Sequence, residues 1–148
     1  MVNATFSPAR FAAIEQFQHE SWLAQVKSLF SRLTANNNRL DSFSACLPGL
    51  LPERHYLGVQ EICLAQVTGS VGRSTDFDRS FRPLKAHLRD RWVNLYLLLQ
   101  SGAWPPVRVY KVGEQYFVSD GHHRVSVAHS IGMRAIQAEV WEYTSKAV

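Results

Sequence analysis

The sequence contains no hydrophobic run long enough to cross a membrane. Its longest uninterrupted apolar segment covers residues 95–99, whereas a membrane-spanning helix needs about 18 apolar residues or more. The first thirty residues leave no room for the apolar segment of a signal peptide, because charged residues and a histidine interrupt them at Arg10, Glu15, His19, Glu20 and Lys27. We therefore expect a cytoplasmic protein with no membrane partner.

Cysteine is scarce, and the composition also excludes a disordered chain. The two cysteines, Cys46 and Cys63, form no C-x-x-C pair, so cysteine alone builds no zinc or redox motif. Without a signal peptide we expect a reducing compartment and two free thiols. Hydrophobic residues make up 46% of the 148 residues and charged residues 19%, which suits one globular unit of about 150 residues.

Apolar periodicity and turn residues predict a mixed α+β protein with an N-terminal helical segment. Ser7 and Pro8 mark the start of a first helix, which a break at 19–21 would divide in two. Its apolar stripe comprises Phe11, Ile14, Trp22, Val26, Leu29 and Leu33. Residues 39–56 give mixed signals and are expected to be irregular. Later elements are a strand at 59–67, a glycine loop at 69–73, a helix at 84–101, a hairpin with strands at 107–110 and 116–118, a short helix from 122 to 131 and a strand at 136–143.

Positive charge is concentrated in one segment. The chain carries a formal charge of +4, and residues 73–91 hold six Lys or Arg against three Asp. One interpretation is a solvated surface. The other is an anion site for nucleotide phosphates or nucleic acid.

Residues 120–124 join the hairpin to the short helix and carry the clearest chemistry. Free N–H groups and partial positive charge at a helix N-terminus stabilise anions. Gly121 leaves room for a phosphate, Arg124 offers a bidentate grip, and His122 and His123 offer donors or proton transfer. Alternatively, Asp120 is an ordinary N-cap and the His-His-Arg triplet is a solvated first turn.

Two segments resemble the boxes of the ParB/sulfiredoxin superfamily. The last box reads Gly-His-His-Arg at 121–124, where ParB-type domains carry Gly-Glu-Arg-Arg and sulfiredoxins Gly-Cys-His-Arg. The first box covers 69–73, followed by Asp76 and Phe77. Further matching positions are Pro105, Pro106, Val109, Tyr110, Tyr116, Phe117, Val118, Ala128 and Gly132. The resemblance covers roughly residues 58–143, so we divide the chain into a helical extension packed on the core (1–57) and a ParB/sulfiredoxin-like domain (58–148), together one compact unit.

The resemblance implies a small mixed sheet with packed helices and a nucleotide site at the last box. ParB-like domains bind CTP and sulfiredoxins bind ATP, so the expected ligand is CTP or ATP/ADP. The residues expected at the phosphates are Gly72, Arg73, Arg79, Asp120, Gly121, His122, His123 and Arg124. We expect Arg124→Ala to abolish nucleotide binding without loss of the fold.

The chain also departs from both branches of the superfamily. Sulfiredoxin chemistry needs a thiolate nucleophile in the box, and His122 stands at that position, so we expect no sulfinic acid reductase. Only five residues follow Tyr143, so we expect no helix-turn-helix module of a partition protein downstream.

Whether the chain is an enzyme stays open, and three functions compete. The first is nucleotide binding with or without hydrolysis, in which Mg²⁺ would neutralise the phosphates. The carboxylates available to it are Asp76 and Asp78, and also Asp120 where that residue is not the N-cap. The second is phosphoryl transfer to a small molecule, with His122 or His123 as general base. The third is a DNA-binding or nuclease function, with a phosphate track along Arg79, Arg82, Lys85 and Arg89 and aromatics that stack or belong to the core at Phe77, Phe81 and Trp92. Phe17 and Trp22 mark a possible homodimer surface.

Overall fold

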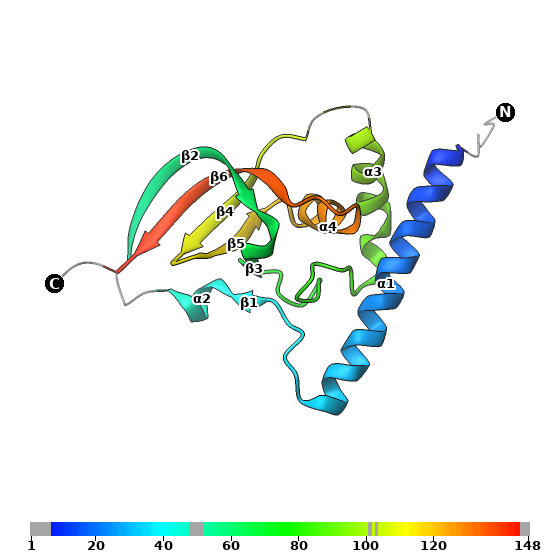
Figure 1. Cartoon of the computed structure of the whole chain (residues 1–148), viewed down its shortest axis with the longest axis horizontal. Coiled ribbons are helices and arrows are strands. Elements are labelled where there is room, and N and C mark those ends of the chain that lie inside the picture. The colour runs from blue at the N-terminus through cyan, green and yellow to red at the C-terminus, as the bar shows by residue number, and fades with distance from the viewer. Residues whose placement is uncertain (1–6, 48–51, 101, 103, 146–148) are drawn as a thin grey trace.

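The computed structural model describes residues 7–47, 52–100, 102 and 104–145 (Figure 1). It has the α+β architecture expected from the sequence, a mixed sheet with packed helices and a long N-terminal helix. The elements in chain order are α1 (Pro8–Thr34), β1 (Asp41–Ser42), α2 (Phe43–Cys46), β2 (Glu53–Cys63), the 3₁₀ turn η1 (Leu64–Gln66), β3 (Val67–Ser70), the 3₁₀ turn η2 (Ala86–Leu88), α3 (Arg89–Gln100), β4 (Val107–Val112), β5 (Gln115–Asp120), α4 (His122–Ser130) and β6 (Ala135–Thr144).

Six strands form one sheet in the order β1-β3-β5-β4-β6-β2. The strands β3 and β5 lie side by side and parallel, with Ser70 opposite Val118. Parallel neighbours end at the same edge of a sheet. The loop after β3 and the turn after β5 therefore leave the sheet together, which brings the two boxes of the sequence next to each other.

Three helices are stacked on the sheet (Figure 1). Helix α4 packs on β4, α3 packs on α4, and α1 packs on α3. Trp92 of α3 links these layers, because its ring meets Phe17 of α1 edge-on and its Nε1–H donates to Ser126 Oγ of α4 at 2.9 Å. Phe77 and Phe81 are fully buried, like Trp92. The three aromatics of the basic segment are therefore core residues, unavailable for stacking on nucleic acid bases.

Several local expectations were wrong. Helix α1 runs without interruption through 19–21, and the helix expected from residue 84 is the turn η2 followed by α3. Within the stretch expected to be irregular, residues 41–46 form β1 and α2 and residues 53–56 belong to β2. Pairing explains the early start of β2, which follows β6 from Glu53 opposite Thr144 to Cys63 opposite Ala135. These long-range hydrogen bonds outweigh the mixed local signals. The boundary expected between residues 57 and 58 falls within this strand.

Most of the apolar stripe of α1 faces away from the core. Trp22 and Leu33 are 62% and 77% exposed, and Phe11 and Leu29 are exposed as well, whereas Ile14 packs against the core. The opposite face carries the buried residues Ala13, Phe17 and Ala24. Phe17, expected with Trp22 at a homodimer surface, is therefore a core residue that packs on Trp92 of α3.

No helix within the described ranges combines the length and the apolar character that a membrane span requires. Both cysteines are free thiols, as expected.

Candidate functional site

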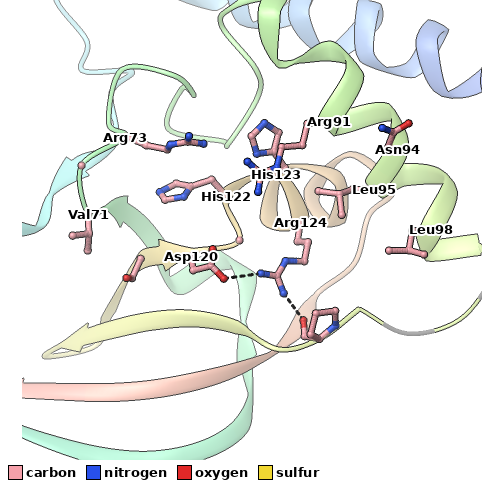
Figure 2. Close-up of a pocket in the computed structure, with 14 residues that line it drawn as sticks. Val71, Arg73, Arg91, Asn94, Leu95, Leu98, Asp120, His122, His123 and Arg124 are labelled. Atoms are coloured by element: carbon pink, nitrogen blue, oxygen red, sulfur yellow. Dashed lines mark hydrogen bonds and ion pairs between the residues drawn. The ribbon is translucent and has the colours of Figure 1, made fainter.

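A pocket of about 610 Å³ lies where the two boxes meet α3 (Figure 2). This volume is within the range of small-molecule sites, about 300–1,000 Å³. Its lining residues come from the loop after β3, the turn between β5 and α4, the start of β4 and one face of α3. They are Val71, Gly72, Arg73, Arg91, Asn94, Leu95, Leu98, Pro105, Ser119, Asp120, Gly121, His122, His123 and Arg124.

Gly121 forms the sharp turn at the floor of this pocket. It is the N-cap of α4, in the left-handed region with a φ of 100°. A Cβ at this position would lie 2.6 Å from Cγ1 of Val107, so glycine is required for both conformation and space. The first helical bond runs from Val125 N–H to Gly121 O. The N–H groups of the first turn therefore have no partner within the helix, and this end of α4 borders the pocket.

The carboxylate of Asp120 is not the N-cap that one interpretation of the sequence gave. The N-cap of α4 is Gly121, and no side chain caps the helix. Instead, Asp120 Oδ2 accepts a hydrogen bond from Arg124 Nη2 at 3.0 Å. Asp120 thus holds the arginine one turn further along, as an i,i+4 ion pair.

The guanidinium of Arg124 is engaged inside the protein. Its Nη2 donates to Asp120. Its Nη1 donates to the backbone oxygens of Pro105 and Pro106, at 2.6 and 3.1 Å. The side chain is 11% exposed. Arg124 therefore fastens the start of β4 to the first turn of α4, while it also lines the pocket.

His122 is connected to the first box through Ser70. Its Nε2 lies 2.6 Å from Ser70 Oγ, and the same hydroxyl oxygen accepts the N–H of Arg73 at 3.1 Å. Burial, reinforced by the positive charge of Arg73, lowers the pKa of His122 to about 4. The imidazole is therefore neutral at pH 7.

His123 is also buried and neutral. Its ring meets Phe77 edge-on with 5.5 Å between centroids. Burial lowers the pKa of His123 to about 4, with further contributions from the charges of Arg91 and Arg73. A base with so low a pKa is mostly unprotonated at pH 7 but has little driving force to take a proton. The two histidines are therefore suited to hydrogen bonding more than to rapid proton transfer.

Arg73 and Arg91 supply positive charge from two different elements. Figure 2 shows Arg73 on the loop after β3 and Arg91 on α3, both close to the histidines. Among the ion pairs of the described residues, neither arginine has a carboxylate partner. An anion in the pocket would therefore meet two arginines whose charge no neighbouring acid neutralises.

Helix α3 contributes pocket residues that the sequence analysis missed. Four of them follow one another at helical spacing on one face, namely Arg91, Asn94, Leu95 and Leu98. This spacing was readable within the helix predicted at 84–101. Nothing in the sequence indicated that this face would border the last box, because its position depends on how α3 packs on α4.

Three residues expected at the site are not among those that line the pocket. Arg79 pairs with Asp41 at 3.5 Å, and Asp76 pairs with Lys85 at 3.2 Å. Asp78 is buried, and its Oδ1 accepts the N–H groups of Ser80 and Arg82, both at 2.9 Å. Burial raises the pKa of Asp78 despite these bonds. Within the described part of the chain, no group of three or more His, Cys, Asp or Glu could hold a metal ion.

The basic segment expected as a phosphate track is largely neutralised by acidic neighbours. Arg79 and Lys85 have the partners given above. Arg82 lies 3.2 Å from Glu20, and Arg89 lies 3.4 Å from Asp90. The excess charge of the segment is therefore available mainly at its two ends, Arg73 and Arg91.

Comparisons with known proteins gave one partial likeness. No model of a protein family matches the chain, and neither does any curated protein. Among solved structures, the chain is similar to sulfiredoxin from Arabidopsis thaliana, with a TM-score of 0.41 and 19% identity over 55% of this chain and 82% of that one. The function proposed below depends on this chain's own residues.

Proposed function

We propose that this protein binds a nucleotide, CTP or ATP/ADP, with its phosphates at the N-terminus of α4. The observation that carries the proposal is the convergence on one pocket of this helix end and of two arginines without acidic partners. Free N–H groups and arginines are the usual partners of phosphate oxygens. Two cations from separate elements suit a ligand with more than one negative charge.

The wall formed by α3 gives the proposed ligand an apolar neighbour. Leu95 and Leu98 line the pocket beside Arg91 and Asn94. A nucleobase needs such a surface for its ring faces and a few polar groups for its edge. The phosphates would lie toward Arg73, Arg91 and Gly121, and the base toward Leu95 and Leu98 of α3.

Mg²⁺ would enter this site mainly with the phosphates. Among the residues that the structure describes, Asp120 is the one carboxylate that lines the pocket, and it pairs with Arg124. Mg²⁺ keeps several waters and is commonly bound through one or two carboxylates together with substrate phosphates. This chain would contribute at most the Asp120 carboxylate to a bound Mg²⁺. The protein would therefore bind the nucleotide mainly through arginines and helix N–H groups.

Hydrolysis or phosphoryl transfer would be slow at this site. The candidate general bases are His122 and His123. Their pKa values are lowered to about 4, which limits their basicity at neutral pH. His122 also has its Nε2 engaged with Ser70. Binding is therefore the primary function that we propose, with nucleotide hydrolysis as a secondary one.

Calorimetric titration with CTP, ATP, ADP and GTP, with and without Mg²⁺, tests the proposal. We expect one of them to bind the parent protein and Arg124→Ala to bind it more weakly, because the variant no longer anchors the turn that presents the N–H groups of α4. Arg79→Ala is the matched control, because Arg79 is paired with Asp41 and does not line the pocket. If none of the four nucleotides binds, the proposal is wrong, and salt-dependent binding to DNA becomes the next measurement.

A homodimer through the outer face of α1 is our proposal for a partner. Phe11, Trp22, Leu29 and Leu33 are large, apolar and exposed on this face, and a contiguous exposed apolar surface is typical of protein interfaces. Light scattering on the full chain should give the mass of a dimer, and Trp22→Glu should give that of a monomer. A monomeric parent protein at high concentration would contradict the proposal.

A further inference from the structure

We propose that Ser70 is a positioning residue of the anion site. Its hydroxyl donates to Nε2 of His122 and so fixes this imidazole as the Nδ1–H tautomer, a neutral donor to the ligand's phosphate. The identity of the ligand rests on the proposed function. The tautomer is a property of the free protein and can be measured without any ligand.

Ser70 connects the two boxes at a buried point. It is the last residue of β3 and is 1% exposed. Its Oγ contacts His122 Nε2 at 2.6 Å, across 52 positions of sequence, and accepts the N–H of Arg73 at 3.1 Å. One hydroxyl therefore joins the loop that carries Arg73 to the first turn of α4.

The donors and acceptors of this hydroxyl determine the direction of the short bond. A serine hydroxyl has one O–H to donate and two lone pairs to accept with. The N–H of Arg73 occupies one lone pair. If Nε2 of His122 carried the proton, it would occupy the second, and the O–H of Ser70 would have no acceptor among the described residues.

A buried donor without an acceptor is costly. The alternative leaves no group unsatisfied, because Ser70 O–H then donates to an unprotonated Nε2. A neutral imidazole with a bare Nε2 carries its proton on Nδ1. The surroundings of Ser70 therefore select the Nδ1–H tautomer of His122.

The Nδ1–H tautomer of His122 gives an anion a hydrogen-bond donor. His122 lines the pocket, and Nδ1 is the ring nitrogen that Ser70 leaves for a ligand. The ring is held in place by stacking on Phe77, with 6.2 Å between centroids and 16° between planes. A phosphate oxygen accepts hydrogen bonds and would be repelled by a bare ring nitrogen. Ser70 thus leaves Nδ1–H as a donor for a ligand although the imidazole is uncharged.

Nitrogen NMR on the free protein tests the tautomer directly. Two-bond proton–nitrogen correlations of the histidine rings at pH 7 distinguish a protonated ring nitrogen from a bare one, and the spectrum of His122→Gln assigns the signals. We expect a protonated Nδ1 and a bare Nε2 for His122 in the parent protein. A protonated Nε2 in that spectrum would overturn the proposal, and this measurement needs no Ser70 variant to fold.

Two variants separate positioning from simple loss of packing. Ser70→Thr keeps the hydroxyl, so it should retain the Nδ1–H signal and the nucleotide affinity of the parent. Ser70→Ala removes the donor and should lose the tautomer preference, with about tenfold weaker binding of the nucleotide identified by calorimetry. A folded Ser70→Ala protein with an unchanged His122 spectrum would overturn the role of Ser70.

The outcomes for the tautomer and for nucleotide binding are independent. A parent protein with the Nδ1–H tautomer that binds none of CTP, ATP, ADP and GTP would contradict the proposed function and leave the Ser70–His122 assignment standing. A parent protein that binds a nucleotide with Nε2 protonated would overturn that assignment and leave the proposed function standing.

Discussion

Two sides of one pocket use arginine in opposite ways. At the turn between β5 and α4, Arg124 donates to Asp120 and to two backbone oxygens. Across the pocket, Arg73 and Arg91 have no carboxylate within ion-pair distance among the described residues. The conspicuous arginine of the last box is held by the protein, whereas the two that are less conspicuous have their charge available. An arginine that belongs to a sequence motif is therefore not always the arginine whose charge is available to a ligand.

The largest effect should come from removing both available charges. A charge-assisted hydrogen bond is worth about 1.5–3 kcal/mol, and 1.4 kcal/mol is a factor of ten in affinity. Arg73→Ala combined with Arg91→Ala should therefore weaken nucleotide binding by about a hundredfold or more, measured by calorimetry. Thermal unfolding should change little, since neither side chain has an ion pair to lose. A double variant that binds the nucleotide as tightly as the parent would contradict the claim that Arg73 and Arg91 supply the charge for the ligand.

The next effect concerns the buried histidines between the two sides. Their pKa values are lowered to about 4 in the folded protein from 6.5, so the unfolded chain takes up protons first as the pH falls. The free energy of unfolding should therefore decrease as the pH falls from 6.5 to about 4. Each of the two histidines should contribute a slope of up to about 1.4 kcal/mol per pH unit in this range. Denaturant unfolding at a series of pH values measures it.

A histidine variant provides the control for that slope. His122→Gln with His123→Gln should reduce the slope to the part contributed by His129, whose pKa is also lowered by burial. An equal slope in the parent and the double variant would show that the two imidazoles are not the cause.

Arg124→Ala should show the double role of this side chain. Besides weaker nucleotide binding, we expect a decrease of about 1–3 kcal/mol in the free energy of unfolding, because Asp120 and two carbonyl groups lose their partner. A domain with a typical stability of about 5–15 kcal/mol would still fold. Unchanged stability in urea would mean that Arg124 is as available to a ligand as Arg73 is.

The smallest effect should separate two glycines with positive φ. Gly121 and Gly113 have φ values of 100° and 60°, but an added Cβ meets Val107 only at Gly121 and meets nothing within 4 Å at Gly113. Gly113→Ala should cost about 1 kcal/mol for its conformation alone, and Gly121→Ala should cost more. Equal melting temperatures for the two variants would contradict the close approach at the turn.

Local patterns predicted the parts of the structure that depend on neighbours in sequence. The alternation of apolar and polar residues predicts the hairpin and β6, and the turn at Gly121 predicts the start of α4. The pairing of the parallel strands β3 and β5, which brings the two boxes together, is a long-range contact. The face of α1 was not predictable, because Ala13 and Ala24 pack inside while Trp22 stays outside. The buried face combines these two alanines with Phe17, which packs on Trp92 of α3, and this tertiary contact has no local signal in the sequence.

Ion pairing between distant segments explains the remaining differences at the site. The partner of Arg82 is Glu20, at a separation of 62 positions, and the partner of Arg79 is Asp41, at a separation of 38. No local pattern shows that these acids neutralise the basic segment. Arg91 entered the site for the same kind of reason, since only the packing of α3 on α4 brings it beside His123.

The most direct test of the account is the affinity of Arg91→Ala for the nucleotide that the parent protein binds, with Arg79→Ala titrated in parallel. Both variants remove one arginine from the same basic segment, but only Arg91 lines the pocket. We predict at least tenfold weaker binding for Arg91→Ala and parent-like binding for Arg79→Ala. Equal affinities for the two variants would contradict the claim that the charge available to the ligand lies at Arg73 and Arg91.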